Sequence, residues 1–532
     1  MKLKNKKRTG SYYTPELVAS FMVNYLSEKM TDKTDISILE PSAGDGSFVN
    51  SIFTNETFSN RIKSLIAIEK SKSELNKIKT INRAFVAINS DFLEYQKNNE
   101  RIFDLVIGNP PYIKNNLLSA RQTKICKEIH SEAKLSDTRP KNIWTAFLVR
   151  CIKFTSENGV LGFVLPAELL QVKFASELRA LLIKEFDRIE IFTFNELLFP
   201  DSKGQDTVLL ICERKSKNNG VFYCNIDKLS DLKNNNFTLA QNIHIKESKW
   251  MHHHLSTDDI NLLERLKSNI KNVNNYCNSK AGIVTAANDY FIINSETMKK
   301  YSLEKFSKQI IQKGVFVNGS VILTKKGFQQ LIDDCKPSYL IALDKESKIN
   351  GHKEINDYLK IGTERNIHTR YKTSIRKKWY EVPNVGSPPE AFFFKRCNAY
   401  PKLIKNDANV LVTDSAYMIS MNEDFKIENL IFSFYNSLTL SFAELNGRYY
   451  GGGVLELTPN EFKNLPIPYI SIEPIEFKLF VENFKNKDSI TEICKKNDIK
   501  ILKSIDEKLT TDDIQKIQKI REKLYYRRIK TH

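Results

Sequence analysis

The chain has 532 residues, of which 41% are hydrophobic and 27% are charged. This balance is typical of globular domains and excludes a disordered or fibrous chain, and the length leaves room for about two to four domains. Lysine and arginine number 81 against 63 aspartates and glutamates, so the formal net charge is +18, with +7 in residues 1–245 and +11 in residues 246–532. Such a surplus attracts polyanions such as nucleic acids, although a chain in which lysine is simply frequent has the same composition.

No stretch approaches the roughly 18 consecutive apolar residues of a membrane span. The basic start at 1–8 is not followed by an apolar segment, so no signal peptide is expected. The eight cysteines show no C-x-x-C spacing and are interpreted as reduced thiols of a cytosolic protein. No metal site is expected, because the adjacent residues His252, His253 and His254 cannot all face one ion.

In the first half, short apolar runs alternate with longer stretches of helical spacing. The runs lie at 37–39, 65–68, 84–88, 104–107, 159–165, 189–194 and 207–212. This alternation predicts a mainly parallel, doubly wound α/β sheet, and the apolar spacing between residues 144 and 151 predicts a helix over 140–157 packed on it. Beyond residue 245 the runs become irregular, so a second domain is expected, ending in an amphipathic helix over 506–530.

The strongest local signal is Asn109-Pro110-Pro111-Tyr112, which follows directly on the apolar run 104–107. In open α/β sheets ligands bind beyond the carboxyl ends of strands, so this tetrapeptide is expected at the active edge. The prolines restrict the backbone, which would hold the Asn109 side chain and the Pro110 carbonyl in fixed positions. A plain strand-ending turn is the alternative interpretation.

Upstream, residues 38–48 read as a strand, a glycine turn and a helix start. Glycines let the backbone approach a ligand closely, but Glu40 and Asp45 would repel a pyrophosphate, which favours a ligand with a positive or neutral face. Glu69 and Asp91 end the next two predicted strands. A carboxylate at the first position can accept hydrogen bonds from a ribose diol, and one at the second can hold an adenine amino group. Each carboxylate alone also fits a solvated strand end or a helix cap.

In chain order, these motifs resemble those of the N6-adenine DNA methyltransferases of the gamma arrangement, the group that contains modification enzymes of type II restriction systems. Segment 10–15 resembles the N-terminal motif of the cofactor pocket, 39–48 resembles the S-adenosylmethionine loop, and 109–112 matches the catalytic motif. Phe199 falls where this group places an aromatic ring that packs against the target base. The motifs cover about residues 9–213 of the chain.

The resemblance implies a class I S-adenosylmethionine-dependent methyltransferase fold over 1–245, Rossmann-like with a doubly wound mixed sheet, and an α+β DNA target-recognition domain over 246–532 with a helical tail. It implies S-adenosylmethionine as cofactor, duplex DNA as partner, a separate cognate restriction endonuclease as a further candidate partner, a bacterial cytoplasmic location, and action as a monomer on DNA. The residues implied for the cofactor are Tyr13, Thr14, Glu40, Ser42, Ala43, Gly44, Asp45, Glu69, Lys70, Asp91, Phe92 and Asn109. The residues implied for catalysis are Asn109, Pro110, Tyr112 and Phe199.

Adenine N6 is a weak nucleophile because its lone pair is delocalised into the ring. The Asn109 side-chain oxygen and the Pro110 carbonyl can accept its two hydrogens, so positioning and electrostatics would support a direct in-line transfer without a covalent enzyme intermediate. A base inside a duplex is out of reach and must be flipped out. Tyr112 and Phe199 would then stack on its two faces, although core packing explains either ring alone.

Three other activities remain open from the residues. A glutamine-directed protein methyltransferase is one, because N-P-P-Y can bind any planar amide or amino group, but those enzymes are short and need no long basic second half. An RNA adenine methyltransferase is another. A fused endonuclease–methyltransferase is disfavoured, because its nuclease would precede the first motif, which here begins at Gly10.

In the second half, segments 282–291, 380–383, 436–440 and 444–457 resemble pieces of the DNA-recognition region of the same group. The first of these usually reads Thr-Gly where this chain has Thr285-Ala286. A dense basic stretch at 365–378, interleaved with aromatic residues, suits contact with phosphates, and a solvated charged face is the alternative. The residues expected to contact DNA are Lys372, Arg376, Lys377, Lys378, Arg448 and Tyr449.

Overall fold

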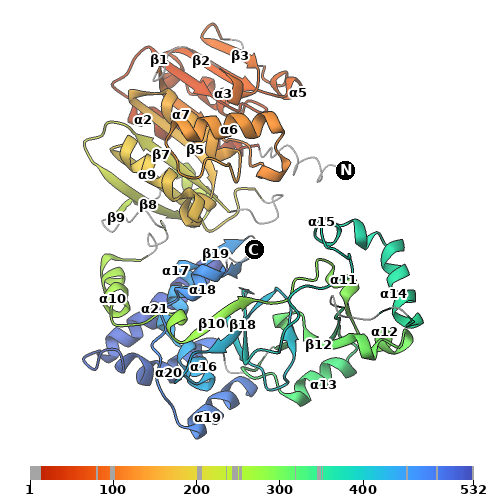
Figure 1. Ribbon diagram of the computed structural model, residues 1–532. Coiled ribbons are helices and arrows are strands. Elements are labelled where there is room, and N and C mark those ends of the chain that lie inside the picture. The colour runs from red at the N-terminus through yellow and green to blue at the C-terminus, as the bar shows by residue number, and fades with distance from the viewer. Residues whose placement is uncertain are drawn as a thin grey trace. The chain divides into compact units, whose positions relative to one another are not determined.

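The computed structural model of the protein describes residues 13–79, 82–95, 102–199, 206–234, 237–242, 250, 255–317, 319–343, 349, 351–450, 453–486 and 489–529. The chain forms two compact units, the first built mainly from Met1–Thr257 and the second from Asp258–Tyr449 and Gly453–Ile529 (Figure 1). The units divide at 257/258, whereas the sequence placed the boundary at 245/246. No described helix has the length and apolar character that crossing a membrane requires.

The first unit contains a nine-stranded sheet in the order β3-β2-β1-β4-β5-β7-β6-β8-β9. Its strands are β1 (Ile36–Glu40), β2 (Ile62–Glu69), β3 (Phe85–Asn89), β4 (Phe103–Gly108), β5 (Thr155–Pro166), β6 (Arg188–Phe194), β7 (Thr207–Glu213), β8 (Gly220–Ile226) and β9 (Ala240–Asn242). The strands from β3 to β5 are parallel, and β7 is antiparallel to both of its neighbours. The seven predicted runs form β1 to β7, which confirms the mixed α/β fold. The last two strands of the sheet, β8 and the edge strand β9, were not predicted.

Helices cover both faces of this sheet. Neighbouring residues of a strand point to opposite faces, and in β4 these are Val106 and Ile107, both fully buried. Ile107 shares a hydrophobic core with α2 (Glu16–Lys29) and α3 (Ser47–Thr54). On the other face α7 (Trp144–Phe154) contacts β4 and β5, which confirms the helix predicted over 140–157. The other described helices of this unit are α4 (Glu56–Ser59), α5 (Lys72–Leu75), α6 (Ala120–Glu132), α8 (Glu168–Gln171) and α9 (Ser176–Glu185).

The strand order reverses between β1 and β4. These two strands are hydrogen-bonded neighbours, with β2 and β3 on the far side of β1 and β5 on the far side of β4. Ligands of open α/β sheets bind beyond the carboxyl ends of strands at such a point. Because β1 ends at Glu40 and β4 ends at Gly108, the glycine turn and the N-P-P-Y segment leave the sheet side by side.

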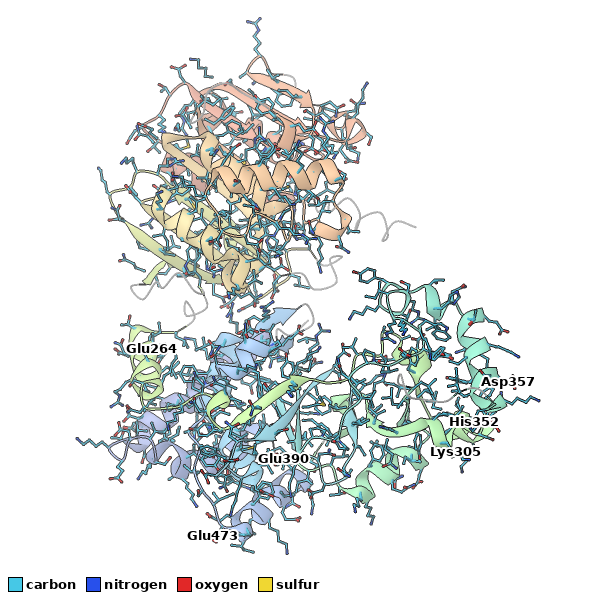
Figure 2. The ribbon with its side chains drawn as sticks, in the orientation of Figure 1. Glu264, Lys305, His352, Asp357, Glu390 and Glu473 are labelled. Carbon is cyan, nitrogen blue, oxygen red and sulfur yellow. The ribbon has the colours of Figure 1, made fainter. Side chains whose placement is uncertain are left out.

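The second unit combines three smaller sheets with many helices, which confirms the expected separate α+β domain. The sheet orders are β10-β18-β14-β16, β11-β13-β12-β17 and β15-β20-β19. The strands are β10 (Cys277–Ala281), β11 (Ile292–Ile293), β12 (Ser307–Ile311), β13 (Tyr339–Ile341), β14 (Ala391–Phe394), β15 (Arg396–Cys397), β16 (Lys402–Lys405), β17 (Leu411–Val412), β18 (Ala416–Met421), β19 (Arg448–Tyr450) and β20 (Val454–Glu456). Side chains fill the interior between the sheets and helices, whereas charged residues such as Glu473 and Lys305 lie on the outside (Figure 2).

The helices of this unit surround its sheets and form its C-terminal part. They are α10 (Thr257–Lys267), α11 (Asn288–Phe291), α12 (Ser295–Lys300), α13 (Lys325–Asp333), α14 (Lys353–Glu364), α15 (Tyr371–Ser374), α16 (Ile427–Phe434), α17 (Ser437–Asn446), α18 (Pro459–Lys463), α19 (Pro474–Lys485), α20 (Ile490–Lys503) and α21 (Thr511–Arg528). The last of these confirms the predicted amphipathic helix, since Ile514, Ile517 and Leu524 are buried. It begins at Thr511 rather than at 506, because the Thr510 side chain caps it.

A buried ion pair closes the end of α21 onto α17. The Arg528 guanidinium, whose side chain is 1% exposed, donates to both carboxylate oxygens of Glu444 at 2.8 Å. It also donates to the Asn398 carbonyl at 2.6 Å. Each charge lies away from water, so each depends on the other for its solvation.

Replacing Arg528 with Met should lower the stability of the second unit by about 3–5 kcal/mol, because the Glu444 carboxylate would remain buried without its partner. Hydrogen–deuterium exchange of α17 and α21 in rising urea measures this change. The control is Arg265→Met, because Arg265 forms a partly exposed ion pair with Asp506 and such pairs contribute only about 0–1 kcal/mol. Equal losses in the two variants would contradict the role assigned to the buried pair.

Candidate active site

The residues after β1 form a tight turn into α3. Gly44 and Gly46 have φ angles of +56° and +88°, in the left-handed region that favours glycine. The Gly46 N–H donates to the Ala43 carbonyl at 2.8 Å, and the Ala43 N–H donates to the Ile68 carbonyl of β2 at 3.0 Å. The turn is therefore closed on itself and attached to the neighbouring strand.

The Glu69 carboxylate at the end of β2 also holds this turn. Its Oε2 accepts a hydrogen bond from the Gly44 N–H at 2.9 Å, and its Oε1 accepts one from the Ser71 N–H at 2.7 Å. The Tyr13 ring lies against the turn, since a Cβ on Gly44 would come within 3.4 Å of it. A carboxylate oxygen has more than one acceptor position, so Glu69 can keep both backbone bonds while accepting others from a ligand.

Glu40, the last residue of β1, is a buried acidic group, 1% exposed. Burial, reinforced by the neighbouring carboxylates of Glu69 and Asp45, raises the pKa of Glu40 well above its ordinary range. Its Oε2 atom has no hydrogen-bond partner among the described residues, whereas Asp45 accepts from the Ser47 hydroxyl at 2.8 Å. A buried acceptor calls for a donor or a positive charge, so this part of the site fits a cationic group and not a phosphate.

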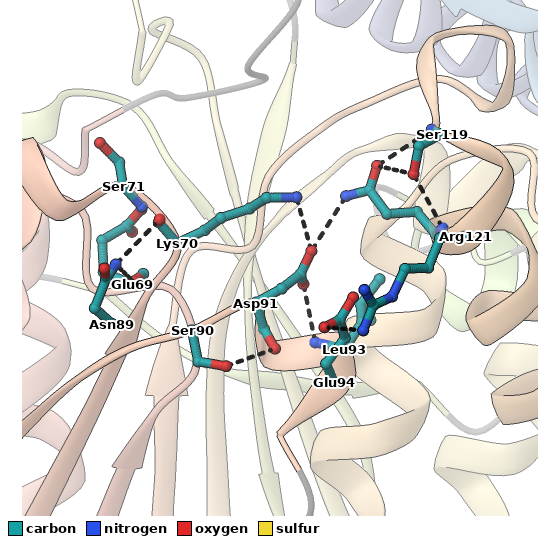
Figure 3. Close-up of polar contacts among 11 residues, drawn as sticks. Glu69, Lys70, Ser71, Asn89, Ser90, Asp91, Leu93, Glu94, Ser119 and Arg121 are labelled. Carbon is teal, nitrogen blue, oxygen red and sulfur yellow. Dashed lines mark hydrogen bonds and ion pairs between the residues drawn. The ribbon is translucent and has the colours of Figure 1, made fainter.

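Asp91 lies just beyond the end of β3, where three donors converge on its carboxylate (Figure 3). Lys70 Nζ lies 2.8 Å and Gln122 Nε2 3.3 Å from Oδ2, and the Leu93 N–H donates to Oδ1 at 3.1 Å. Lys70 itself follows β2, and its side chain is 63% exposed. The structure thus brings together Lys70 and Asp91, which the sequence placed in the cofactor site without pairing them.

Asn109 is the point where three segments that are distant in the sequence meet. Its Nδ2 donates to Thr14 Oγ1 at 3.2 Å, and the Ser42 hydroxyl donates to its main-chain carbonyl at 3.1 Å. Thr14 precedes α2, and Ser42 belongs to the glycine turn. Because the amide donates through its nitrogen to Thr14, its Oδ1 is presented on the opposite side as an acceptor. The strand end is close-packed, since a Cβ on Gly108 would lie 3.2 Å from Pro41.

Three aromatic residues predicted for the site are largely buried. Tyr112 is 7% exposed, and its hydroxyl donates to the Val164 carbonyl of β5 at 3.0 Å. Phe199 is 6% exposed and belongs to the core beneath α2. The Phe92 ring is 2% exposed and packs on Phe147 with centroids 5.1 Å apart, so Phe92 can meet a ligand only through its backbone.

One part of the site was not predicted from the sequence. The segment before α7 runs along the backbone that follows N-P-P-Y. The Asn115 N–H donates to the Lys141 carbonyl at 3.1 Å, and the Ile143 N–H donates to the Ile113 carbonyl at 2.9 Å. No periodicity marks these bonds, because they join two irregular backbone segments.

Gln122 was also missed, although a readable signal existed. Ser119 and Gln122 form the capping box at the start of α6, and Ser-x-x-Gln before a helix is a recognisable pattern. The box locates the helix start. Only the fold shows that this start lies beside Asp91.

The residues predicted to contact DNA fall into two groups. Lys372, Lys377 and Lys378 are exposed. Among the described residues, no ion pair involves Lys372 or Lys377, whereas Lys378 Nζ lies 3.8 Å from Glu381. Lys372 and Lys377 are therefore the basic residues of this set that are most available to phosphates.

The other three residues are engaged within the second unit. Arg376 donates to the carbonyls of Val284 and Thr285 at 3.2 and 2.9 Å, and burial lowers its pKa. Arg448 donates to Glu461 at 3.0 Å, and the Tyr449 hydroxyl donates to a main-chain carbonyl of α17 at 2.5 Å. Their donors hold the fold together, which makes them less suited to phosphate contact than the two exposed lysines.

The segment 282–291 contains two tight backbone positions. A Cβ on Gly282 would lie 2.2 Å from the Thr413 carbonyl oxygen, so only glycine fits there. Ala286 has a φ of +68°, which is the left-handed conformation of a glycine. Glycine, which the resembling group usually carries at this position, would adopt this conformation without strain.

Protein-family models match segments in both halves of the chain, and curated proteins are similar to it in sequence. Residues 19–199 match the model described as Eco57I restriction-modification methylase, and residues 247–502 match the C-terminal domain of type II methyltransferase M.Eco57I. The type II methyltransferase M.AccI of Acinetobacter calcoaceticus is 25% identical over 481 residues, which cover 86% of this chain and 85% of that protein. M.HincII of Haemophilus influenzae is 29% identical over 229 residues, covering 42% and 41%.

Solved structures show the same fold. The type IIL restriction-modification enzyme MmeI, determined in complex with DNA, aligns with a TM-score of 0.60 at 13% identity, over 99% of this chain and 80% of that one. The DrdV–DNA complex aligns with a TM-score of 0.53 at 13% identity, over 92% of this chain and 58% of that one.

Replacing Ala286 with Gly should raise the stability of the second unit by about 0.5–1 kcal/mol. The replacement removes the strain of alanine in the left-handed conformation, and this gain exceeds the entropic cost of folding a glycine. Urea unfolding, followed by hydrogen exchange in 282–291, measures the change. Ala281→Gly at the last residue of the adjacent strand β10 is the control and should lower stability instead, because glycine loses more conformational freedom on folding than alanine. A loss in both variants would show that Ala286 carries no strain.

Proposed function

The chain belongs to the Eco57I family of type II restriction-modification methyltransferases, and we propose that it transfers a methyl group from S-adenosylmethionine to N6 of an adenine flipped out of duplex DNA. The family makes it a DNA methyltransferase of a restriction-modification system. The proposal adds the cofactor, the methylated atom and the flipped base. The observation that supports it most is the position of Asn109 at the β1–β4 reversal, with its amide oriented by Thr14 and its carbonyl held by Ser42.

The residues around the glycine turn suit S-adenosylmethionine. The site carries buried and partly buried carboxylates where a phosphate-binding site would carry donors, and this favours a ligand with a sulfonium and an ammonium group. We assign the ribose hydroxyls to Glu69, the adenine amino group to Asp91, and the positive end of the ligand to the buried Glu40, whose Oε2 has no partner among the described residues. When bound, this cofactor supplies an electrophilic methyl group on a positively charged sulfur.

Asn109 and Pro110 act on the nitrogen that receives the methyl group. The Asn109 Oδ1 and the Pro110 carbonyl accept the two N6 hydrogens, which directs the nitrogen lone pair out of the ring plane. Such placement of acceptors ahead of the reaction contributes through positioning and electrostatics. The extra proton leaves readily, because a doubly substituted cationic nitrogen is acidic, and no covalent intermediate with the protein is needed.

Tyr112 and Phe199 are assigned to the flipped base. Tyr112 lies three residues after Asn109 in the sequence. The hydrogen bond of its hydroxyl to the Val164 carbonyl of β5 fixes the position of its ring. Stacking of a base on an aromatic ring contributes about 1–3 kcal/mol. This would offset part of the cost of removing the base from the duplex.

We assign reading of the DNA sequence to the second unit, which matches the C-terminal domain of a type II methyltransferase and lies in the half of the chain with the larger positive surplus, +11. Neither a protein-glutamine substrate nor RNA explains such a domain. We expect the enzyme to act as a monomer in a bacterial cytoplasm, alongside a separate endonuclease of the same specificity.

Replacing Glu69 with Ala should weaken binding of S-adenosylmethionine by about tenfold or more, because the variant loses an acceptor for the ligand and also releases the Gly44 turn. Isothermal titration calorimetry measures the dissociation constant. Glu56→Ala is the control, since Glu56 is an exposed residue of α4. Unchanged affinity in the Glu69 variant would remove this residue from the cofactor site.

Replacing Asn109 with Ala should lower methyl transfer to duplex DNA by about two to three orders of magnitude while DNA affinity stays near wild type, since the lost contacts act on the reacting nitrogen. Tritium transfer to plasmid DNA gives the rate, and sequencing of the modified DNA identifies the methylated base. Asn116→Ala, an exposed asparagine in the same loop, is the control.

Two outcomes would contradict the proposal. Turnover of the Asn109 variant within a few fold of wild type would eliminate the proposed acceptor role. Methylation of RNA or of a protein in parallel assays, without methylation of duplex DNA, would overturn the substrate.

A further inference from the structure

A short segment of the second unit displays two apolar side chains to solvent. Among the described residues, Tyr371 at 79% and Ile375 at 70% are the most exposed large hydrophobic side chains. They lie four residues apart, on α15 and the residue that follows it. Residues four apart in a helical turn share one side, so the two side chains form one protruding apolar patch.

The segment that carries this patch is anchored on both sides. Before it, the Arg370 guanidinium donates to both carboxylate oxygens of Asp289 at 2.8 and 2.9 Å, and this bond holds the pKa of Asp289 below its ordinary value. After it, Arg376 donates to the carbonyls of Val284 and Thr285. Both anchors therefore end on the segment 282–291.

The centre of the segment is anchored as well. Thr373 is fully buried, and the single hydrogen of its hydroxyl is shared between the carbonyls of Ile367 and Arg370. Ile367 is 1% exposed and belongs to the hydrophobic core of this part of the unit. The exposure of Tyr371 and Ile375 is thus not the result of loose packing, because the backbone between them is fixed while their side chains point outward.

The charge around the patch selects its partner. Lys372 lies between the two patch residues in the sequence and Lys377 two residues beyond them; both are exposed, with no ion pair among the described residues. Of the nearby acidic groups, Asp289 is paired with Arg370, and Glu381 lies beside Lys378. The surface around the patch is therefore positive, which favours a polyanion over an acidic or neutral protein surface.

We propose that residues 370–377 form a rigid DNA-docking element, in which Tyr371 and Ile375 pack against bases while Lys372 and Lys377 contact nearby phosphates. This rests on the proposed function in one respect, that the partner is DNA. Apolar side chains presented on a firm backbone can wedge between or against bases, and aromatic rings stack on them without requiring a particular sequence. The lysines of this stretch predict contact with phosphates only. The two apolar side chains would add contact with the bases.

The first test is photo-crosslinking. Replacing Tyr371 with p-benzoylphenylalanine in the full-length protein and irradiating it with linearised plasmid DNA should give a covalent protein–DNA product. The control carries the same group at Leu479, which is 61% exposed on α19, at a place in the second unit far from α15 (Figure 1). Nuclease digestion and mass spectrometry should locate the crosslink on a base. A yield at 371 no higher than at 479 overturns the proposal.

The second test separates base contact from phosphate contact. With a short duplex cut from the same plasmid around a methylated position, Tyr371→Ala should raise the dissociation constant about tenfold, and Tyr371→Phe should bind like wild type, because the contact is with the ring. The slope of log K against log salt should stay unchanged for Tyr371→Ala and should become shallower by about 0.9 for Lys377→Ala. A reduced slope in Tyr371→Ala would make the patch part of the electrostatic surface only and would overturn the proposal.

These outcomes are distinct from failure of the proposed function. If the wild-type protein methylates duplex DNA but the crosslink and the affinity change are absent, the docking element fails and the methyltransferase assignment stands. If the protein binds DNA and crosslinks through residue 371 but transfers no methyl group, the docking element stands and the proposed chemistry fails. Crosslinking of residue 371 to a protein and not to DNA would overturn the choice of partner.

Discussion

The geometry of the first unit depends on one meeting point, where Asn109 donates to Thr14 and accepts from Ser42. Each bond joins segments that the chain order separates widely, and the adjacency of β1 and β4 makes both possible. Strand order thus places the glycine turn against N-P-P-Y, and the side chains then lock the two together. The Thr14 bond orients the side-chain amide of Asn109, whereas the Ser42 bond holds its main chain.

The protein combines a basic overall charge with an acidic candidate active site. The chain as a whole is strongly basic, yet the residues around the glycine turn are acidic, and Glu40 lies buried beside Glu69 and Asp45. A positive surface draws DNA to the protein over long distances, whereas carboxylates at the strand ends disfavour phosphate at the place where the methyl donor would bind.

The sequence was informative where local chemistry determines structure. Apolar runs predicted β1 to β7, and a strand followed by two prolines located Asn109 at the sheet edge. The roles of Arg376 and Arg448 could not be predicted, because a guanidinium in a basic stretch reads the same whether it faces solvent or donates to Thr285 or Glu461. Only the tertiary contacts of each arginine decide between these two possibilities. The backbone pairing of 141–143 with 113–115 could not be predicted either, because hydrogen bonds between irregular segments leave no periodic pattern in the sequence.

The two anchors of α15 have a consequence for exchanging segments between relatives. Arg370 ends on Asp289 and Arg376 ends on the carbonyls of residues 284 and 285, so the segments 282–291 and 365–380 form a single structural module despite the long stretch of chain between them. A graft that moved only one of the two segments would transfer only one partner of each of these contacts, and the other partner would remain in the original chain. Engineered recombinants should therefore have their crossover points outside both segments, so that the module is inherited whole.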